Sequence, residues 1–354
     1  MSQPPSDVSD ENETRALLRL IAAGGSSAAR CSLIERLGGA ARAVAAGPDA
    51  WREAGWSEEQ VRALSSAVAP SDGLGWLKAP THHLIGWHHD DYPPLLRKSP
   101  NPPLALFVAG DPALLWQPTI AVVGSRGPTP GGRDNARDFA RAFAASGLVV
   151  GSGLAAGIDT AAHTATLDAG GRTIAVLGTG PDVPYPRANG ELHARIARDG
   201  AIVSEYLPGT QAVAFHFPSR NRILAGLSVA TVVIEAAERS GALITARLAA
   251  EAGREVFAVP GSIHNPLARG CHRLIRDGAA LVGSAQDVID AITPQVAALA
   301  QDLRRQLGAP IHPAQAAGAD ARRGPDLADP DYQTLWRALG HDQPLWISWC
   351  SGPD

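Results

Sequence analysis

The sequence predicts an α/β fold: a Rossmann-like, doubly wound and mainly parallel sheet with a small N-terminal all-α domain. Between residues 119 and 293, short apolar runs alternate with longer helical stretches, and each run ends in glycine or a small polar residue. The runs are apolar at successive positions, which is typical of strands buried on both faces of a parallel sheet. Apolar residues spaced three and four apart between residues 14 and 67 predict the helices of the smaller domain.

The predicted sheet domain alternates strands with right-handed helical crossovers. The expected strands are 119–123, 148–150, 173–177, 201–204, 230–234 and 256–259. The expected helices are at about 131–146, 157–169, 188–198, 219–228, 243–253, 269–277 and 284–292. Open sheets of this kind bind their ligands beyond the carboxyl ends of the strands, so we expect the functional residues in the loops that follow the strands.

The segments outside the sheet domain carry weaker patterns. Residues 1–13 are polar and acidic and are expected to be disordered, whereas residues 14–78 indicate a helical domain of the SAM or helix-hairpin-helix kind. The proline-rich residues 79–118 indicate an extended connector with one short strand. Residues 294–329 indicate a linker, and residues 330–354 contain too little periodic sequence to bury a core of their own.

Composition limits the cellular setting. Hydrophobic residues make up 45% and charged residues 19% of the 354 positions, which is typical of a folded, soluble chain. Apolar runs stay below the roughly 18 residues of a membrane span and the N-terminus is acidic, so we expect no membrane association and a cytoplasmic location. Cys31, Cys271 and Cys350 are far apart in the sequence, which favours neither a disulfide framework nor a metal site.

Charge limits the kind of nucleic-acid binding that is possible. The net charge is −4 and the pI is about 6.3, which argues against a protein that coats nucleic acid by bulk electrostatics. Residues 119–293 contain 16 Arg, no Lys and 15 Asp plus Glu, so this region is nearly neutral. Any nucleic-acid site must therefore be local. We attribute the bias from lysine to arginine to a GC-rich genome rather than to function.

The loop after the first expected strand contains residue types that bind phosphate. Gly124 lets the backbone approach a ligand, Ser125 adds a hydroxyl donor, and Arg126 offers a forked cation next to the free N–H groups of a helix start. Taken alone, the same loop is also compatible with a plain strand-to-helix turn that carries a surface arginine.

The second and third loops are also rich in glycine. The second includes Ser152 and Gly153, and its G-x-G-x-x-x-G spacing, with no acid near Thr173, disfavours a dinucleotide-dependent oxidoreductase. His163, one turn into the next helix, is expected to have a capping or packing role. The third loop contains Tyr185, an aromatic residue that could stack on a base.

Arg220, Asn221 and Arg222 form the most specific element of the sequence. They stand at a helix start after a proline turn, where cations are unfavourable unless an anion arrives to offset them. This local conflict indicates a binding site, although a solvated arginine pair is the simpler alternative. A further Gly/Ser turn opens the next helix and adds Ser240, Gly241 and Thr245 to the candidates.

Five segments in this order resemble the DNA-processing protein A family (DprA, also called Smf). They are IAVVGSR, GSGLAAGIDTAAH, FPSRNRILAGLS, ERSGALITA and RLIRDGA, and together they cover about residues 119–285. The resemblance extends more weakly to the helical N-terminal part and to DYPPLL. In many members a winged-helix module follows, of which this chain is expected to keep only a remnant in 330–354, with one helix at 332–340.

The resemblance implies a bacterial, cytosolic, non-enzymatic protein of natural transformation. Such a protein binds incoming single-stranded DNA, protects it from nucleases, helps to load the RecA recombinase, and is usually a homodimer built through the Rossmann-like domain. It implies neither a metal nor a cofactor. Carried over by position, its DNA-binding residues are Gly124, Ser125, Arg126, Ser152, Gly153, Arg220, Asn221, Arg222, Ser240, Gly241 and Thr245.

A nucleotide hydrolase-like enzyme is the alternative from another class, because Rossmann-like sheets with glycine-rich loops also house such enzymes. Asp159, Glu205 and Glu235 lie at or near expected strand ends and could act as general bases. We favour capping and arginine pairing for these three carboxylates, and expect no catalytic residue.

Overall fold

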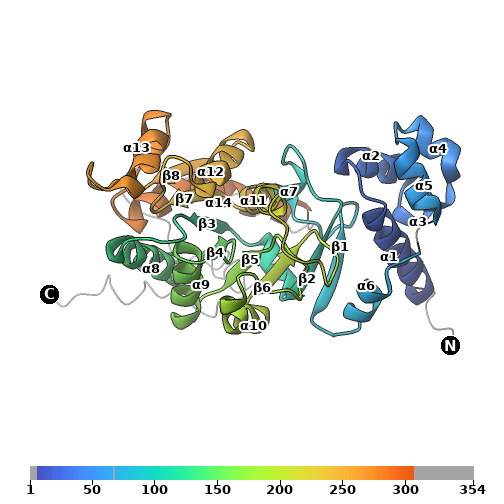
Figure 1. Ribbon diagram of the computed structural model, residues 1–354, viewed down its shortest axis with the longest axis horizontal. Coiled ribbons are helices and arrows are strands. Elements are labelled where there is room, and N and C mark those ends of the chain that lie inside the picture. Colours follow the sequence, from blue (N-terminus) through green and yellow to red (C-terminus); the bar gives the residue numbers. More distant parts are fainter. Residues whose placement is uncertain (1–5, 67, 307–354) are drawn as a thin grey trace, which may run out of the picture.

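The computed structural model describes residues 6–66 and 68–306 of the chain, which form one nine-stranded sheet, helices on both of its faces, and a helical domain at one end (Figure 1). The strand order is β1-β2-β6-β5-β4-β3-β7-β8-β9. The strands are β1 (His82–Gly86), β2 (Ala105–Gly110), β3 (Thr119–Val123), β4 (Val149–Ser152), β5 (Thr173–Val176), β6 (Ala201–Ser204), β7 (Ala230–Val233), β8 (Glu255–Ala258) and β9 (Ala280–Leu281).

Strands β3 to β9 are all parallel, which confirms the predicted fold class. The chain enters this part of the sheet at β3, winds outward through β4, β5 and β6, and then returns to place β7 on the other side of β3. Ile120 pairs with Ala230 and Val123 with Val233 in that central contact. The direction of winding reverses between β3 and β7, so this is the topological switch point of the sheet.

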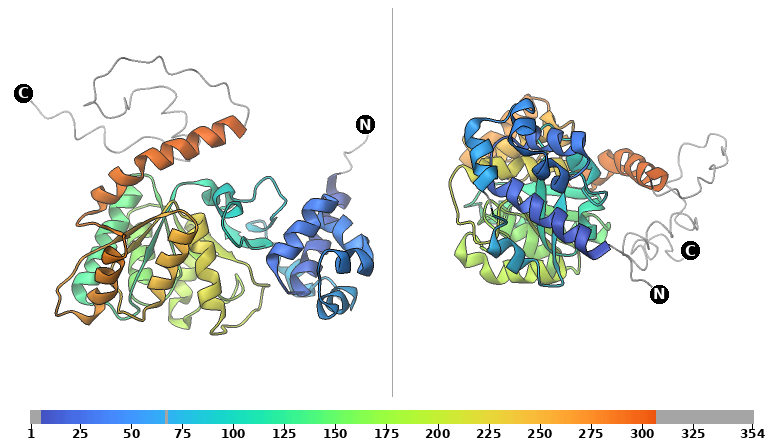
Figure 2. Two further views of the ribbon diagram at one scale, coloured as in Figure 1. Left: turned by 90° about the horizontal axis from the view of Figure 1, so that it is seen from above. Right: turned by 90° about the vertical axis from the view of Figure 1, so that its right-hand side faces the viewer.

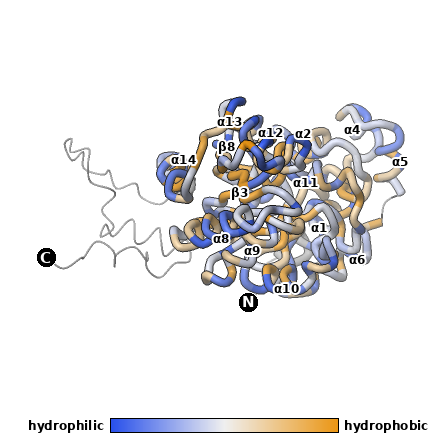
Figure 3. Tube along the Cα trace, turned by 60° about the vertical axis from the view of Figure 1, so that its left-hand side comes forward, coloured by the Kyte–Doolittle hydropathy of each residue, from blue (hydrophilic) through white to orange (hydrophobic). Residues whose placement is uncertain are grey.

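Helices cover the two faces of the sheet with separate apolar cores. Helices α8, α9 and α14 bury Phe139, Phe143 and Ile289 on one face, whereas α7, α11 and α12 bury residues such as Leu96 and Leu224 on the other. Figure 3 shows the contrast between the hydrophobic strand β3 and the largely hydrophilic surface helix α13. The helices here are α7 (Pro94–Arg97), α8 (Pro130–Ala145), α9 (Ile158–Asp168), α10 (Gly190–Asp199), α11 (His216–Leu227), α12 (Gly241–Glu251), α13 (Arg269–Arg276) and α14 (Ala285–Gln306), with short 3-10 turns at Pro112–Trp116, Arg187–Asn189 and Pro266–Ala268.

The helical domain lies at the opposite end of the molecule from α8 and α13 (Figure 2). Its core includes Leu20, Ile34, Trp51 and Leu64 and is shared with Leu104 next to β2. Its helices are α1 (Ser6–Ala22), α2 (Ser27–Leu37), α3 (Ala40–Ala45), α4 (Gly47–Glu53), α5 (Glu58–Ser66) and α6 (Ser71–Trp76).

The expectation of a simple connector at residues 79–118 is wrong, because two strands of this segment belong to the sheet. Strand β2 pairs antiparallel with β6, and β1 pairs antiparallel with β2. Leu106, Phe107 and Val108 are completely buried. The prolines flank β2 instead of interrupting it, and the otherwise unpaired edge of β6 supplies a hydrogen-bonding partner that local sequence patterns do not reveal.

Helix α1 begins at Ser6, so residues 6–13 are helical and were wrongly expected to be disordered. The Glu13 carboxylate accepts hydrogen bonds from the backbone N–H groups of Ala40 and Ala41, which fastens α1 to α3.

The first part of the expected linker at 294–329 is also helical, because α14 continues to Gln306. Val296 and Leu299 continue the apolar stripe of this helix and pack against the core beneath α8, so packing outweighs the presence of Pro294 inside the helix. The rest of the expected linker and residues 330–354 lie outside the described residues. No helix among the described residues is long and apolar enough to cross a membrane.

His163 of α9 is completely buried between the helix and the sheet. Its Nδ1 lies 2.7 Å from the Thr173 hydroxyl, which donates its own proton to the Val150 carbonyl. The hydroxyl must therefore accept from Nδ1–H, and Nε2 is left unprotonated, with no hydrogen-bond partner in the described part of the chain. Burial lowers the pKa of His163 to about 3, and repulsion from Arg220 adds to this effect.

Stability should fall in acid because unfolding allows His163 to take up a proton. Its folded pKa lies below the ordinary value of 6.5, so its contribution is present above pH 6.5 and is lost as the pH falls toward 3. Between pH 7 and pH 5 the loss should be about 2 kcal/mol, measured by urea unfolding. His163→Gln should remove this part of the pH dependence. An unchanged slope in the variant would contradict the neutral assignment.

Candidate nucleic-acid interface

The loops at the carboxyl ends of the central strands pack directly against one another. The backbone N–H of Ile158, at the start of α9, donates to the Ser125 carbonyl at 3.1 Å. Gly157 has a φ of 86°, and a Cβ atom there would lie 2.3 Å from the same carbonyl oxygen. Only glycine fits this close approach, which joins the loop after β3 to the loop after β4. We call residues 124–129, 153–157 and 235–241 the strand-end loops.

Arg126 is one of two exposed cations of the strand-end loops, the other being Arg239. Within residues 6–66 and 68–306 the Arg126 side chain forms no hydrogen bond or ion pair. The neighbouring Ser125 hydroxyl accepts a 3.2 Å hydrogen bond from the backbone N–H of Gly127, which shapes the turn. Gly124 lies between Ile158 and the Glu235 carbonyl, with no room for a Cβ atom. A rigid turn therefore presents a free guanidinium to solvent.

Arg220 has a different environment, since its side chain is only 5% exposed. Its guanidinium donates to the Gly153 carbonyl at 2.8 Å, to the Val176 carbonyl, and at 3.1 Å to the Asn221 side chain. These contacts correct the expectation of a cation facing the ligand. Arg220 holds the end of β5 and the loop after β4 against α11.

Asp159 carries the charge opposite to Arg220 inside the same region. Its carboxylate accepts hydrogen bonds from the backbone N–H groups of Gly153 at 3.1 Å and Ala155 at 3.3 Å. Burial raises the pKa of Asp159 and lowers the pKa of Arg220 to about 10, while their mutual attraction opposes both shifts. The two buried charges attract each other without an ion-pair contact, and each supports the loop after β4 through its own hydrogen bonds.

Arg222 forms an ion pair with Glu205, and both side chains are mostly buried. The pair interacts electrostatically with Arg30 of the helical domain and with Tyr92. Of the three arginines of the predicted site, Arg126 and Arg220 repel each other electrostatically, whereas Arg222 is neutralised by Glu205. The sequence contained a sign of this, because Glu205 directly follows β6 and is an acid within reach of the start of α11.

The other predicted residues divide into a buried and an accessible group. Ser152 is completely buried and donates to the Val122 carbonyl at 2.6 Å, Thr245 is 2% exposed, and Gly153 is buried. These three support the loops from below. The accessible residues are Gly124, Ser125, Arg126, Asn221, Ser240 and Gly241. Asn221 and Gly241 approach each other at 3.5 Å, which brings α11 and the start of α12 together.

Aromatic side chains line the neighbouring loops, and sequence reasoning found only one of them. Tyr185 is 44% exposed and its ring lies 5.1 Å from that of Phe217. Phe215 is 70% exposed and contacts His216, which stacks on Tyr206 at 3.9 Å. Phe215 and Phe217 stand close to a helix start, and this pattern could have predicted the aromatic side chains from the sequence. The arginines beside them gave the stronger pattern.

A groove of about 240 Å³ continues from Gly157 between α8 and α9. Arg133 and Arg137 line it together with Thr160 and Thr164. Arg137 pairs with Asp134, whereas Arg133 is exposed and has no ion pair in the part of the chain that the structure describes. Arg133 therefore adds a second free cation near Arg126 that sequence reasoning did not single out.

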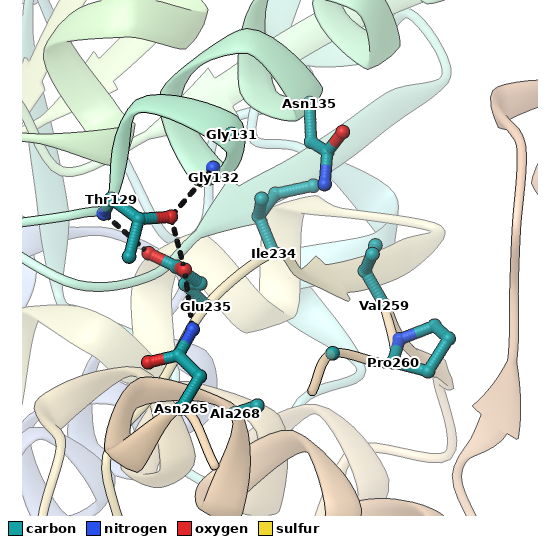
Figure 4. Close-up of a pocket in the computed structure, with 11 residues that line it drawn as sticks. Thr129, Gly131, Gly132, Asn135, Ile234, Glu235, Val259, Pro260, Asn265 and Ala268 are labelled. Carbon is teal, nitrogen blue, oxygen red and sulfur yellow. Dashed lines mark hydrogen bonds between the residues drawn. The ribbon is translucent and has the colours of Figure 1, made fainter. Parts of the chain in front are cut away.

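The switch point contains a cavity of about 190 Å³, lined by Thr129, Asn135, Glu235 and Asn265 among others (Figure 4). The Glu235 carboxylate is 7% exposed and accepts hydrogen bonds from the Thr129 backbone at 2.9 Å, the Thr129 hydroxyl at 2.6 Å and the Asn265 amide at 3.0 Å. All three carboxylates considered as general bases thus have structural partners. Among the described residues no group of three or more His, Cys, Asp or Glu side chains could hold a metal ion.

The fold and its loops define the molecule as a Rossmann-like α/β protein with glycine-rich loops at its strand ends. The family model described as DNA recombination-mediator protein A matches residues 83–293, and the chain belongs to this family. This confirms the resemblance noted in the sequence.

Two relatives show how far the similarity reaches. The DNA processing protein DprA of Streptococcus pneumoniae is 51% identical over 200 residues, which is 56% of this chain and 71% of that protein. Protein Smf of Escherichia coli is 45% identical over 218 residues, which is 61% of this chain and 58% of Smf.

Solved structures of related proteins share the fold. The crystal structure of DprA from Streptococcus pneumoniae matches with a TM-score of 0.69 and 39% identity, covering 77% of this chain and 95% of that one. A structure of DNA processing protein A from Helicobacter pylori, described by its single-stranded DNA binding mode, matches with a TM-score of 0.55 and 28% identity, covering 60% of this chain and 96% of that one.

Replacing Arg220 should destabilise the protein because Asp159 would be left as an uncompensated buried charge. We expect Arg220→Ala to lower the free energy of unfolding by about 3–5 kcal/mol, measured by chemical denaturation. The matched control is Arg141→Ala, which removes an exposed pair with Asp138 and should change stability by less than about 1 kcal/mol. Equal effects in the two variants would rule out the supporting role of Arg220.

Proposed function

We propose that this protein binds single-stranded DNA on its strand-end loops without acting as an enzyme. The observation that carries the proposal is Arg126, an exposed guanidinium without a partner among the described residues, held by a rigid turn in a member of this family. The single-stranded DNA binding mode described for the Helicobacter pylori relative supports the choice of ligand.

Two kinds of contact suit a flexible strand. Arg126 binds a backbone phosphate as a charge-assisted fork, with the Ser125 hydroxyl beside it, and Arg133 continues the path of positive charge along α8. Tyr185 and Phe215 offer exposed rings on which bases can stack regardless of their identity. Such an arrangement binds unpaired DNA with little sequence preference, despite the net charge of −4.

The wider role that we propose follows from family membership. The protein acts in the cytoplasm during natural transformation, protects incoming single-stranded DNA from nucleases and helps to load RecA, as a homodimer built through its sheet domain. The alternative of a nucleotide hydrolase is not favoured, because Asp159, Glu205 and Glu235 are each engaged by protein donors.

Arg126→Ala should weaken binding to oligo-dT and make it less sensitive to salt. A variant that makes one phosphate contact fewer releases fewer counterions when it binds. The slope of log affinity against log salt concentration should therefore become shallower by about 0.7. Fluorescence anisotropy across a salt series measures both quantities. Arg141→Ala, an exposed arginine paired with Asp138, is the control and should leave both unchanged. If Arg126→Ala matches the wild type, the phosphate contact does not exist.

Phe215→Ala and Tyr185→Ala should weaken oligo-dT binding while leaving the salt slope unchanged, because stacking releases no counterions. We expect about 1–3 kcal/mol of binding free energy for each base that stacks. The same anisotropy titrations test this, with duplex DNA of equal length as the comparison ligand. An equal loss on duplex, whose bases are already stacked, would argue against base stacking.

A further inference from the structure

Glu235 lies at the switch point of the doubly wound sheet, which is the usual binding position for a nucleotide. In such folds the phosphate of a bound nucleotide sits at the switch point, against the N-terminus of the helix that follows the first strand. Here that helix is α8, and the switch point lies between β3 and β7. Figure 4 shows the Glu235 carboxylate at this place, directed toward Thr129 and the first turn of α8.

The contact between Glu235 and α8 is close. A Cβ atom on Gly132 would lie 2.4 Å from Glu235 Oε2, so the carboxylate rests on the backbone of the first helical turn. The donors to Glu235 are a backbone N–H, the Thr129 hydroxyl and the Asn265 amide, which are also the kinds of donor that hold a phosphate. No ion pair of Glu235 occurs in the described part of the chain, so these donors and the positive end of α8 stabilise its charge.

We propose that Glu235 is a built-in anion that takes the place of a nucleotide phosphate and makes this protein reject free nucleotides. An entering phosphate would meet a negative charge and find its donors already engaged. The cavity of about 190 Å³ that remains is then closed to phosphate although its position in the fold is the usual one.

The same carboxylate gives the loop that carries Arg126 a fixed anchor. Glu235 binds both the backbone and the side chain of Thr129, at the end of residues 124–129. This second consequence rests on the proposed function. Glu235 keeps the phosphates of a bound strand out of a crevice that would hold a mononucleotide. The phosphates are bound instead on an open surface, along which a continuous strand can pass.

The test compares Glu235→Ala and Glu235→Gln with the wild type and with Glu238→Ala, which removes an exposed carboxylate from the same loop. Isothermal titration calorimetry with pyrophosphate and with ADP measures entry into the crevice. We expect Glu235→Ala to bind both ligands at least tenfold more tightly than the wild type and Glu238→Ala do. Glu235→Gln, which keeps the shape without the charge, should lie between them.

Binding of ADP by the wild type as tightly as by Glu235→Ala would overturn the proposal. So would a folded Glu235→Ala protein, judged by circular dichroism, that gains no affinity for pyrophosphate. If Glu235→Ala does not fold, Glu235→Gln decides on the same criterion. Oligo-dT binding is measured in parallel: a wild type that fails to bind oligo-dT refutes the proposed function, while the pyrophosphate result still decides the role of Glu235.

Discussion

The arrangement of the strand-end loops depends on one buried guanidinium. Arg220 donates to carbonyl groups that belong to the loop after β4 and to the end of β5, and it faces the buried Asp159 at the start of α9. Carbonyl groups at the ends of buried strands need hydrogen-bond donors, and a planar side chain with several N–H groups supplies them in directions that water cannot reach. The shape of the surface near Arg126 is thus set from beneath, by a charge that is itself buried.

A few charged residues of this fold act inside the protein. Asp159 accepts from backbone N–H groups of the loop after β4, Glu235 accepts from the Thr129 N–H at the start of α8, and Arg222 neutralises Glu205. An internal anion at a helix start plays the part that a bound phosphate plays in nucleotide-binding relatives of the same architecture. Exposed side chains without a partner in the described part of the chain, Arg126 above all, are the proposed contacts for an external phosphate.

The strands of the parallel sheet except β9 could be predicted within one or two residues, because a strand buried on both faces is marked by local apolar runs, whereas the two-residue edge strand β9 is exposed and short. The sheet membership of β2 could not, since its antiparallel pairing with β6 joins segments about a hundred residues apart and leaves no local signal, and β1 joins the sheet only by pairing with β2. The residues of the candidate site could likewise be predicted only where a local sequence pattern marks them. Arg126 was placed at the surface by its turn, but Arg220 and Arg222 resemble surface arginines in sequence, and only the three-dimensional packing of Gly153 and Glu205 reveals their partners.

The core shared by the helical domain and β2 determines how this protein can be divided. Leu104 and Ala105 belong to the sheet segment, yet they complete the core around Leu20 and Trp51, and Trp87 packs on its edge. A fragment that begins at residue 79, where proline content suggests a boundary, would expose this apolar surface and lose the Glu13–His88 contact. The sheet domain on its own would be prone to aggregate, and useful truncations must retain the helices or replace the apolar residues that they cover.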